Sequence, residues 1–275
     1  MDPVLCATDD QPDHRHALRT DILRLDLTAS VGLGAHWQAR LRLPVELRQI
    51  AVAYTTLDGA AYDPPYQDIH HRDERLFGLA DGELDASRFW QIGKWSLSGR
   101  AGLTLPLGST EPNPYALGLL GQEHQHHQLG VGTPLVLLGA SAVRIPAPWG
   151  AHANIGGRLP IVENPYGYKA PVTLSAAAGA LRRLGTKLVL MGGADVVVED
   201  SEHWSGEPYQ GRTALQVDGG LEWSPTPRWA FSMNARVPVW QMLADHGHSD
   251  ADGELKLAPS LSLGAAWTGP APSAR

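Results

Sequence analysis

Apolar and polar side chains alternate along most of this chain with the two-residue period of a β-strand. Between residues 36 and 48, for example, Leu41 and Leu43 fall on one face, while Arg40 and Arg42 fall on the other. Eleven segments show this alternation or a strand-like variant of it, namely residues 19–31, 36–48, 80–91, 94–105, 129–144, 150–161, 168–181, 187–198, 211–223, 229–239 and 254–267. The phase is less clear in 80–91 and 129–144, and no segment has the period of an amphipathic helix. The pattern therefore predicts an all-β protein.

The eleven segments are long for strands of a water-soluble domain. Each spans 11 residues or more, whereas strands of soluble proteins commonly have about 5–6 residues and a tilted strand crosses a bilayer with about 9–11. Short connections fall at residues 32–35, near Gly93, and at 147–149, 182–186 and 224–228, and they alternate with long ones at 49–79, 106–128, 162–167, 199–210 and 241–253. This alternation puts all short turns at one end and all long loops at the other. It predicts an antiparallel up-and-down transmembrane β-barrel of the outer-membrane type.

The aromatic residues follow the same division into two ends. Seven of the nine tryptophans fall at or beside the short turns: Trp37, Trp90, Trp95, Trp149, Trp223, Trp229 and Trp267. All seven tyrosines fall at or beside the long loops: Tyr54, Tyr62, Tyr66, Tyr115, Tyr166, Tyr168 and Tyr209. Trp and Tyr prefer the two interfaces between membrane and water. Aromatic residues also cluster near turns in other β proteins, but this two-sided placement favours a barrel that spans a membrane.

The direction of the strands makes a prediction about the number of strands. Segments 19–31 and 254–267 both run from the long-loop end to the short-turn end, so eleven strands cannot close as an antiparallel ring. We expect about twelve strands in the native protein, with a first strand that precedes residue 14. Residues 1–13 are too short and too polar to form it, and they lack the basic and apolar segments of a signal peptide. The expected organisation is a disordered or truncated segment at 1–13, a single barrel domain at 14–267 and a C-terminal tail at 268–275.

Composition narrows the classes of partner. The 275 residues include 22 Lys and Arg against 29 Asp and Glu, a formal net charge of −7, which argues against nucleic acid as a partner. The single cysteine, Cys6, excludes an internal disulfide framework. The sequence contains no run of 18 apolar residues that could form a transmembrane helix. The expected environment is therefore the lipid of the bacterial outer membrane.

Three glycine-containing stretches resemble segments of a known family. They are GLTLPLG at residues 102–108, QLGVGT at 128–133 and NPYGYK at 164–169. They resemble, in that order, the strand-ending G-x-x-x-P-x-G, the G-T-G-[ST] segment and the Asn…Gly-Tyr-Arg loop of the outer-membrane transporters grouped with the phenol-degradation meta-pathway barrels. Val131 replaces the usual Thr, and no Asp follows Thr133. The resemblance covers nearly the whole chain and implies an outer-membrane barrel that takes up small molecules.

Histidines are concentrated on the long-loop segments. Ten of the twelve lie there or at the edge: His14, His16, His70, His71, His124, His126, His127, His203, His246 and His248. Neutral imidazole binds zinc and copper, and two histidines two residues apart on an extended segment can point at one ion. We therefore consider a site for a divalent transition metal, copper or zinc, formed by His70, His71, His124, His126, His127, His203, His246 and His248. The alternative is that these are solvated loop residues.

The inward strand faces carry charges of both signs. The predicted lumen-lining residues are Arg24, Asp26, Arg40, Arg42, Glu46, Arg100, Arg158, Asp195, Asp218, Glu222, Arg236 and Lys256, and Arg212 falls on the same face. Such charges can pair across strands and fill a small lumen, or they can line a pore and set its ion preference. The sequence leaves both arrangements open.

Motifs of common enzymes are missing from the sequence. It contains no G-x-S-x-G, no G-x-x-x-x-G-K-[ST], no H-E-x-x-H and no C-x-x-C, so we expect no enzymatic activity. The predicted function is an outer-membrane channel or transporter for a small molecule or ion, with a histidine-rich external rim. The alternative is a soluble or surface β-domain that binds a small ligand or metal without transport.

Overall fold

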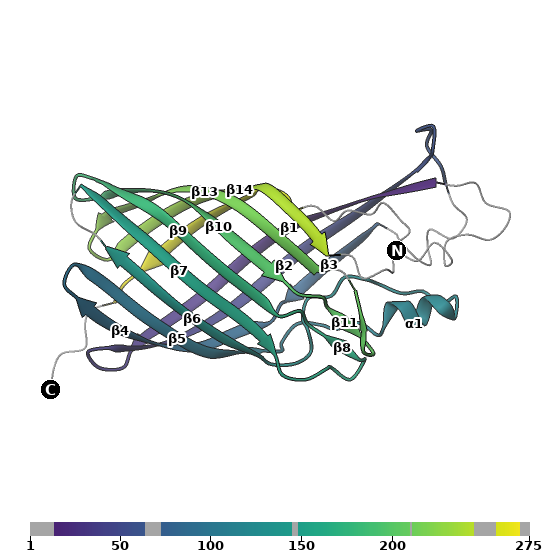
Figure 1. The fold of residues 1–275 in the computed structure, drawn as a ribbon, viewed down its shortest axis with the longest axis horizontal. Helices are drawn as coiled ribbons and strands as arrows, with labels where there is room; N and C mark the ends of the chain where they lie inside the picture. Colours follow the sequence, from purple (N-terminus) through teal and green to yellow (C-terminus); the bar gives the residue numbers. More distant parts are fainter. Residues whose placement is uncertain (1–13, 64–72, 145–147, 210, 245–256, 270–275) are drawn as a thin grey trace.

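Eleven long strands form one antiparallel sheet in the computed structural model, which describes residues 14–63, 73–144, 148–209, 211–244 and 257–269. The strands are β1 (His14–Gly32), β2 (Trp37–Thr56), β4 (Gly82–Ile92), β5 (Trp95–Leu105), β6 (Leu135–Arg144), β7 (Trp149–Pro160), β9 (Thr173–Leu184), β10 (Leu188–Glu199), β13 (Gly211–Thr226), β14 (Trp229–Ala244) and β15 (Ser260–Trp267). They lie side by side in chain order and curl into a barrel wall (Figure 1). The predicted all-β antiparallel architecture is confirmed. No helix in the described part of the chain is long and apolar enough to cross a membrane.

The two ends of the barrel differ as the sequence predicts. Turns at residues 33–36, 93–94, 185–187 and 227–228 join strands at what we call the short-turn end, at the left in Figure 1. The opposite, long-loop end carries a helix, α1 (Pro114–Leu119), and a small sheet of three two-residue strands. The small strands are β8 (Tyr168–Lys169), β11 (His203–Trp204) and β12 (Glu207–Pro208).

Two strands, β6 and β9, begin later than the alternation predicts for a reason that the structure shows, and β15 also begins later, at Ser260 rather than at residue 254. β6 begins at Leu135 rather than at residue 129, because Gly132 has a positive φ of 75° that turns the chain out of the extended conformation. β9 begins at Thr173 rather than at residue 168, because Tyr168 and Lys169 pair with β11 in the small sheet instead. In both cases the residues removed from the barrel wall belong to the structure at its long-loop end.

A bulge explains the unclear phase of segment 80–91. A short strand, β3 (Glu74–Leu79), precedes β4 and pairs with the part of β2 nearer the long-loop end. In the two ladders, Leu79 faces Val45 and Glu83 faces Arg42. Three residues therefore lie between these pairs on one strand, against two on β2, which is the extra residue of a β-bulge. Pro44, which has no N–H to donate, lies opposite the bulge, and its carbonyl accepts a hydrogen bond from the Ala80 N–H at 3.0 Å. The bulge reverses the alternation, so the outward positions are odd-numbered in β3 and even-numbered in β4.

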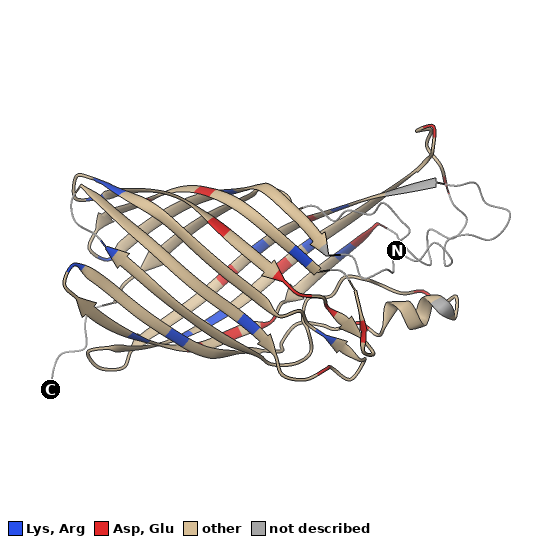
Figure 2. Cartoon of the chain, in the orientation of Figure 1, with Lys and Arg blue, Asp and Glu red and all other residues tan. Residues whose placement is uncertain are grey.

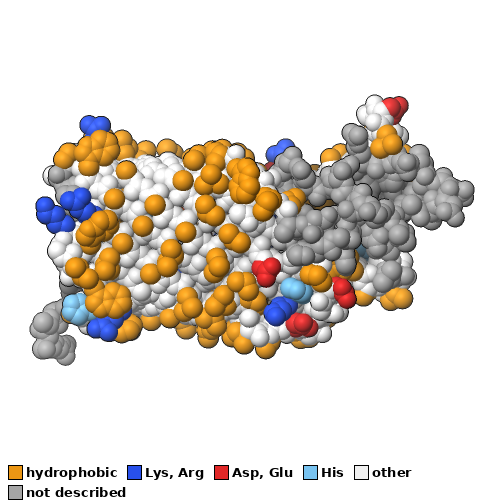
Figure 3. Space-filling view, viewed as in Figure 1, with side chains coloured by type: hydrophobic (Ala, Val, Ile, Leu, Met, Phe, Trp, Pro, Cys, Tyr) orange, Lys and Arg blue, Asp and Glu red, His pale blue; other side chains and the backbone are white. Residues whose placement is uncertain are grey.

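The outer surface of the wall is apolar. Outward side chains such as Ile155, Val217 and Leu263 are exposed, and Figure 3 shows apolar side chains spread over the strands with charges gathered toward the two ends. The seven short-turn tryptophans are all exposed as well. Arg88 stacks over the rings of Trp37 and Trp90. Such a surface is typical of a barrel in lipid, with a belt of tryptophans at one interface between membrane and water.

The tyrosines lie at the long-loop end, but most of them do not form a second lipid-facing ring. Tyr54 and Tyr168 are buried, and Tyr115 stacks on Tyr209 with 4.0 Å between ring centroids. Tyr166, by contrast, is 44% exposed, as a residue at the membrane interface would be. The prediction of their position was correct, but the interpretation as an outer ring was wrong for these residues, because they pack inward with the loops.

β1 and β15 are the edges of the sheet. No ladder joins them within the described residues, and both run from the long-loop end to the short-turn end. The expected first strand falls outside the described residues, as do segments 1–13 and 270–275. The twelfth strand and the predicted organisation of the termini therefore stay predictions.

Adjacent positions on β7 give a test of the two faces. Ile155 points outward and is 63% exposed, whereas Asn154 lines the lumen. We expect Ile155→Arg to lower the free energy of unfolding in lipid vesicles by about 2–4 kcal/mol, because the charge would lie near the bilayer midplane. Asn154→Arg should cost much less. Equal unfolding midpoints for the two variants in a denaturant titration would contradict the assignment of the faces.

Candidate functional site

Segments from three long loops form what we call the plug, at the long-loop end of the barrel. It consists of residues 106–134, which include α1, together with the small sheet β8–β11–β12 (Figure 1). Its apolar centre is a buried cluster of Leu135, Tyr168, Ala170 and Trp204. Tyr115 from α1 packs against this cluster. The plug is therefore held together by side chains from loops that lie far apart in the sequence.

The three family-like stretches meet at one junction between the plug and the wall. Asp81, at the bulge, accepts hydrogen bonds from the backbone N–H groups of Gly108, at 3.0 Å, and Val131, at 2.8 Å. Asn164 donates to the carbonyl of Val131 at 3.2 Å and accepts from the N–H of Tyr168 at 3.0 Å. This junction ties both parts of the plug to one carboxylate of the barrel wall.

Close backbone contact explains two of the glycines in the junction. A Cβ atom on Gly108 would lie 2.5 Å from the backbone nitrogen of Gly130. One on Gly130 would lie 2.4 Å from the Asp81 carboxylate and 2.7 Å from the Gly108 Cα. Real side chains do not approach backbone atoms this closely, so the two segments can cross here only without side chains.

Below the plug, buried carboxylates and arginines form a network on β1, β2, β4 and β7. Glu83 Oε1 accepts hydrogen bonds from two guanidinium groups, Arg42 at 2.7 Å and Arg158 at 2.6 Å. Asp85 accepts from Arg40 at 2.7 Å. The carboxylates lie against the wall, and the arginines cover them on the lumen side.

A second group of charges connects β1 and β2 with the plug. Glu46 pairs with Arg24 at 3.2 Å and with Arg48 at 2.7 Å. Arg48 also donates to the carbonyl of Gln128 in the plug, at 2.8 Å. This second group therefore reaches from β1 to the plug, and Arg48 connects Glu46 with the plug.

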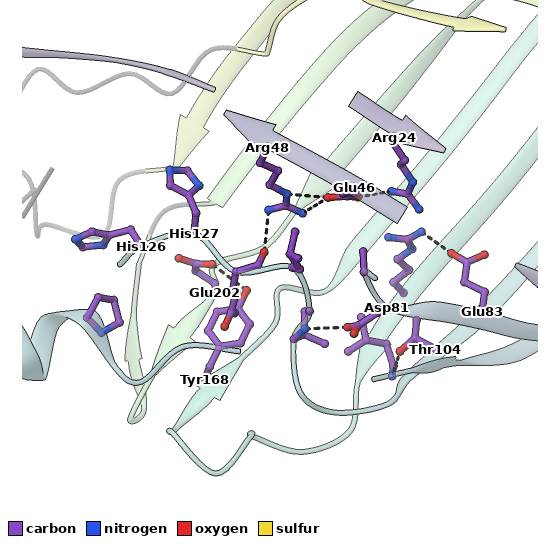
Figure 4. Close-up of a pocket in the computed structure, with 18 of the residues that line it drawn as sticks. Arg24, Glu46, Arg48, Asp81, Glu83, Thr104, His126, His127, Tyr168 and Glu202 are labelled. Atoms are coloured by element: carbon purple, nitrogen blue, oxygen red, sulfur yellow. Dashed lines mark hydrogen bonds and ion pairs between the residues drawn. The ribbon is translucent and has the colours of Figure 1, made fainter. Parts of the chain in front are cut away.

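The network and the plug enclose a cavity of about 390 Å³, which we call the mouth cavity. Figure 4 shows Arg24, Arg48 and Glu83 on its wall side and His127, Tyr168 and Glu202 on its plug side. A further cavity of about 430 Å³ lies in the short-turn half of the lumen. Its lining includes His152, Asn154, Leu181, Met191 and Glu222.

The structure brings most of the predicted lumen charges to the lumen side, in two groups. Arg24, Arg40, Arg42, Glu46 and Arg158 belong to the two groups described above. Asp26 pairs with Arg24 at 2.9 Å, and Arg100 on β5 pairs with Asp85 at 3.9 Å. On the other side of the barrel Arg236 pairs with Asp195 at 3.2 Å, Arg212 pairs with Glu199, and Asp218 faces Arg236 across the ladder. Glu222 lines the cavity near the short turns, and Lys256 lies outside the described residues. Figure 2 shows these charges as single positions along otherwise uncharged strands.

Four acidic residues of the site were missed by the sequence reasoning: Asp81, Glu83 and Asp85 at the wall, and Glu202 beside β11. Glu83 and Asp85 alternate with Leu84 and Ala86 in the strand pattern, which is the signal that could have identified them. The bulge at Asp81 concealed it, because it shifts the phase within segment 80–91.

The predicted metal-binding histidines are only partly described. His124, His126 and His127 lie in the plug and His203 on β11, whereas His70, His71, His246 and His248 lie outside the described residues. The rings of His124 and His126 meet edge to face with centroids 5.1 Å apart. Burial and the nearby Arg48 lower the pKa of His127, which favours its neutral form. Among the residues with a described position, no group of three His, Cys, Asp or Glu could hold a metal ion.

A buried carboxyl makes the plug sensitive to pH. Glu202 accepts a hydrogen bond from the Tyr168 hydroxyl at 3.0 Å. Burial raises the pKa of Glu202 above its ordinary value, and this hydrogen bond only partly opposes the shift. The docked plug therefore binds this proton more tightly than the undocked segment does. The contribution of Glu202 to the stability of the plug is therefore complete below pH 4.5, the ordinary pKa, and is lost as the pH rises through the higher pKa of the docked state.

We expect Glu202→Gln to remove this loss of stability, because the amide stays neutral and can still accept the bond from Tyr168. The measurement is hydrogen exchange of residues 161–172 and 200–209 against pH, corrected for the intrinsic pH dependence of exchange. Protection should fall with rising pH in the wild type and stay level in the variant. Parallel pH profiles would contradict the role of Glu202.

Comparison with known proteins supports the fold without assigning a family. No family model and no curated protein matches the sequence. The structure is similar to the crystal structure of the COG4313 outer membrane channel from Pseudomonas putida F1, with a TM-score of 0.59 and 12% identity over 90% of this chain and 81% of that one. OmpT, an outer membrane protein of Vibrio cholerae, in its loop L8 deletion mutant, matches with a TM-score of 0.43 and 9% identity over 92% of this chain and 99% of that one. The fold, the apolar wall and the ring of tryptophans are those of a bacterial outer-membrane barrel, as the sequence predicts.

Proposed function

We propose that this protein is an outer-membrane channel for small hydrophilic solutes, with the plug controlling entry from the long-loop end. The observation that carries the proposal is the charged lumen: arginines and carboxylates line a cavity of about 390 Å³ directly beneath the plug. Charged groups of both signs keep a lumen hydrated and select among polar solutes. A second cavity of about 430 Å³ lies in the short-turn half of the lumen. The similarity to a solved outer membrane channel supports a channel over an enzyme.

The alternative function, a soluble β-domain that binds a ligand, is disfavoured by the outer wall. A water-soluble barrel turns polar residues outward, whereas here the outward positions of the central strands are exposed and apolar.

Entry of solutes into vesicles tests the proposed function. Purified protein is reconstituted into liposomes, which are exposed to uncharged and charged solutes of increasing size. We expect slow entry of the smallest solutes with the wild type, and faster entry when residues 111–127 are replaced by two glycines. The replacement is feasible because the N–H groups of Leu129 and Gly130 bond to the Ser109 carbonyl at 3.1 and 2.9 Å, so the loop ends already meet. Vesicles as tight as protein-free ones, with both proteins folded, would contradict a channel.

We also propose a test of copper or zinc binding by the plug histidines. Imidazole groups favour these ions, and His124 and His126 lie in contact. We expect weak binding in calorimetry that is reduced in a variant lacking His124, His126 and His127. Indistinguishable titrations of wild type and variant would end the metal hypothesis for these residues.

A further inference from the structure

The arginines at the mouth cavity have more hydrogen-bond donors than the wall carboxylates can satisfy. Arg42 and Arg158 both donate to the same oxygen, Oε1 of Glu83, through one nitrogen each. Each guanidinium has five N–H donors in a planar fork. The Nε of Arg42 is buried without a hydrogen-bond partner among the described residues, and buried donors normally have one.

The arginines of these ion pairs are more exposed than their carboxylate partners, and this difference decides the charge of the cavity surface. The Glu83 side chain is 4% exposed, whereas that of Arg158 is 47% exposed. Glu46 is likewise buried beneath Arg24, which is one-third exposed. A solute in the cavity therefore meets guanidinium groups first and carboxylates only behind them.

Two further acidic groups, Asp81 of the wall and Glu202 beside β11, border this surface, and their oxygens already have partners. Both oxygens of Asp81 are occupied by backbone N–H groups of the plug. The Glu202 carboxyl accepts a hydrogen bond from the Tyr168 hydroxyl at 3.0 Å. Spare donors thus remain on the arginines, while the acceptors already have partners.

We propose that the mouth cavity is a binding site for a small oxyanion, a carboxylate or a phosphate, held by Arg42 and Arg158. The site rests on the proposed channel function, and it names the class of solute that the lumen selects. The planar guanidinium groups can bind either anion through two parallel hydrogen bonds. A cavity of about 390 Å³ accommodates a small solute.

Calorimetry on the folded, detergent-solubilised protein at low ionic strength tests this site, with succinate and inorganic phosphate as separate probes. Arg158→Gln should weaken binding about tenfold, because it removes a charge-assisted contact. Glu83→Gln should strengthen binding severalfold, since it frees Arg42 and Arg158 from their shared partner. An increase in affinity is a readout that a merely structural role of Glu83 would not produce.

Arg88→Gln is the matched control, because Arg88 stacks on Trp37 and Trp90 outside the lumen. It removes the same charge and should leave binding unchanged. Binding of succinate alone, of phosphate alone or of both supports the site and identifies the solute, provided that it depends on Arg158. Absence of binding to the wild type, or equal binding by wild type and Arg158→Gln, overturns the proposal.

The outcome is separable from that of the channel experiment. Vesicle permeation with no Arg158-dependent binding would leave the channel standing and remove the anion site. Arg158-dependent binding without permeation would keep the site and remove the channel.

Discussion

Gly108→Ala is expected to detach the plug from the barrel wall while the wall stays folded. The new Cβ would lie 2.5 Å from the Gly130 nitrogen and 2.6 Å from the Gly130 Cα. Because both are backbone atoms, neither can rotate away. Overpacking of this kind costs about 1–3 kcal/mol. Since the hydrogen bonds of Asp81 to Gly108 and Val131 depend on the same close contact, we expect them to be lost together.

Hydrogen exchange measures this effect region by region. Amides of residues 106–134 should exchange about tenfold faster or more, while those of β9 and β10 stay protected. Gly219→Ala is the control, because nothing lies within 4 Å of the Cβ it would add. Unchanged protection of the plug in Gly108→Ala would show that the junction does not hold it.

Glu83→Gln is expected to destabilise the barrel wall itself. The carboxylate is the shared partner of Arg42 and Arg158, and its second oxygen lies 3.8 Å from Arg40. Its loss leaves guanidinium groups facing one another, which should lower the free energy of unfolding by about 2–4 kcal/mol. Equilibrium unfolding by guanidinium chloride in lipid vesicles measures the change.

Asp26→Asn gives the comparison for this prediction. Asp26 also pairs with an arginine, Arg24, at 2.9 Å, but its side chain is 40% exposed. An exposed pair contributes less than about 1 kcal/mol. Equal destabilisation by the two variants would mean that Glu83 is not the centre of the network.

Strand positions could be predicted from the sequence because they depend on a local pattern. Leu41 and Arg42 point to opposite faces by the geometry of an extended chain alone, and both faces appear on β2 as expected. The same reasoning failed at Asp81, since one inserted residue exchanges the two faces and made the phase of segment 80–91 unclear. Pro44, opposite the bulge, is a signal that could have indicated it.

The plug could not be predicted, because it depends on contacts between distant loops. Asp81, Gly108, Val131 and Asn164 come from four separate parts of the chain and have no shared period. The stretches that contain Gly108, Val131 and Asn164 were recognised, but only as a resemblance to a family of outer-membrane barrels. Nothing in their spacing indicates that they converge on one carboxylate, since that depends on which strands are neighbours in the folded sheet.

The central claim is that the plug closes a charged lumen. Single-channel conductance in planar bilayers tests it most directly. The comparison is between the wild type and the variant in which two glycines replace residues 111–127. That replacement removes Pro114, Tyr115, His126 and His127 from the lining of the mouth cavity and opens it toward the long-loop end. The account predicts discrete, lasting conductance steps for the variant and much smaller or rare ones for the wild type. Equal conductance from the two folded proteins would contradict it.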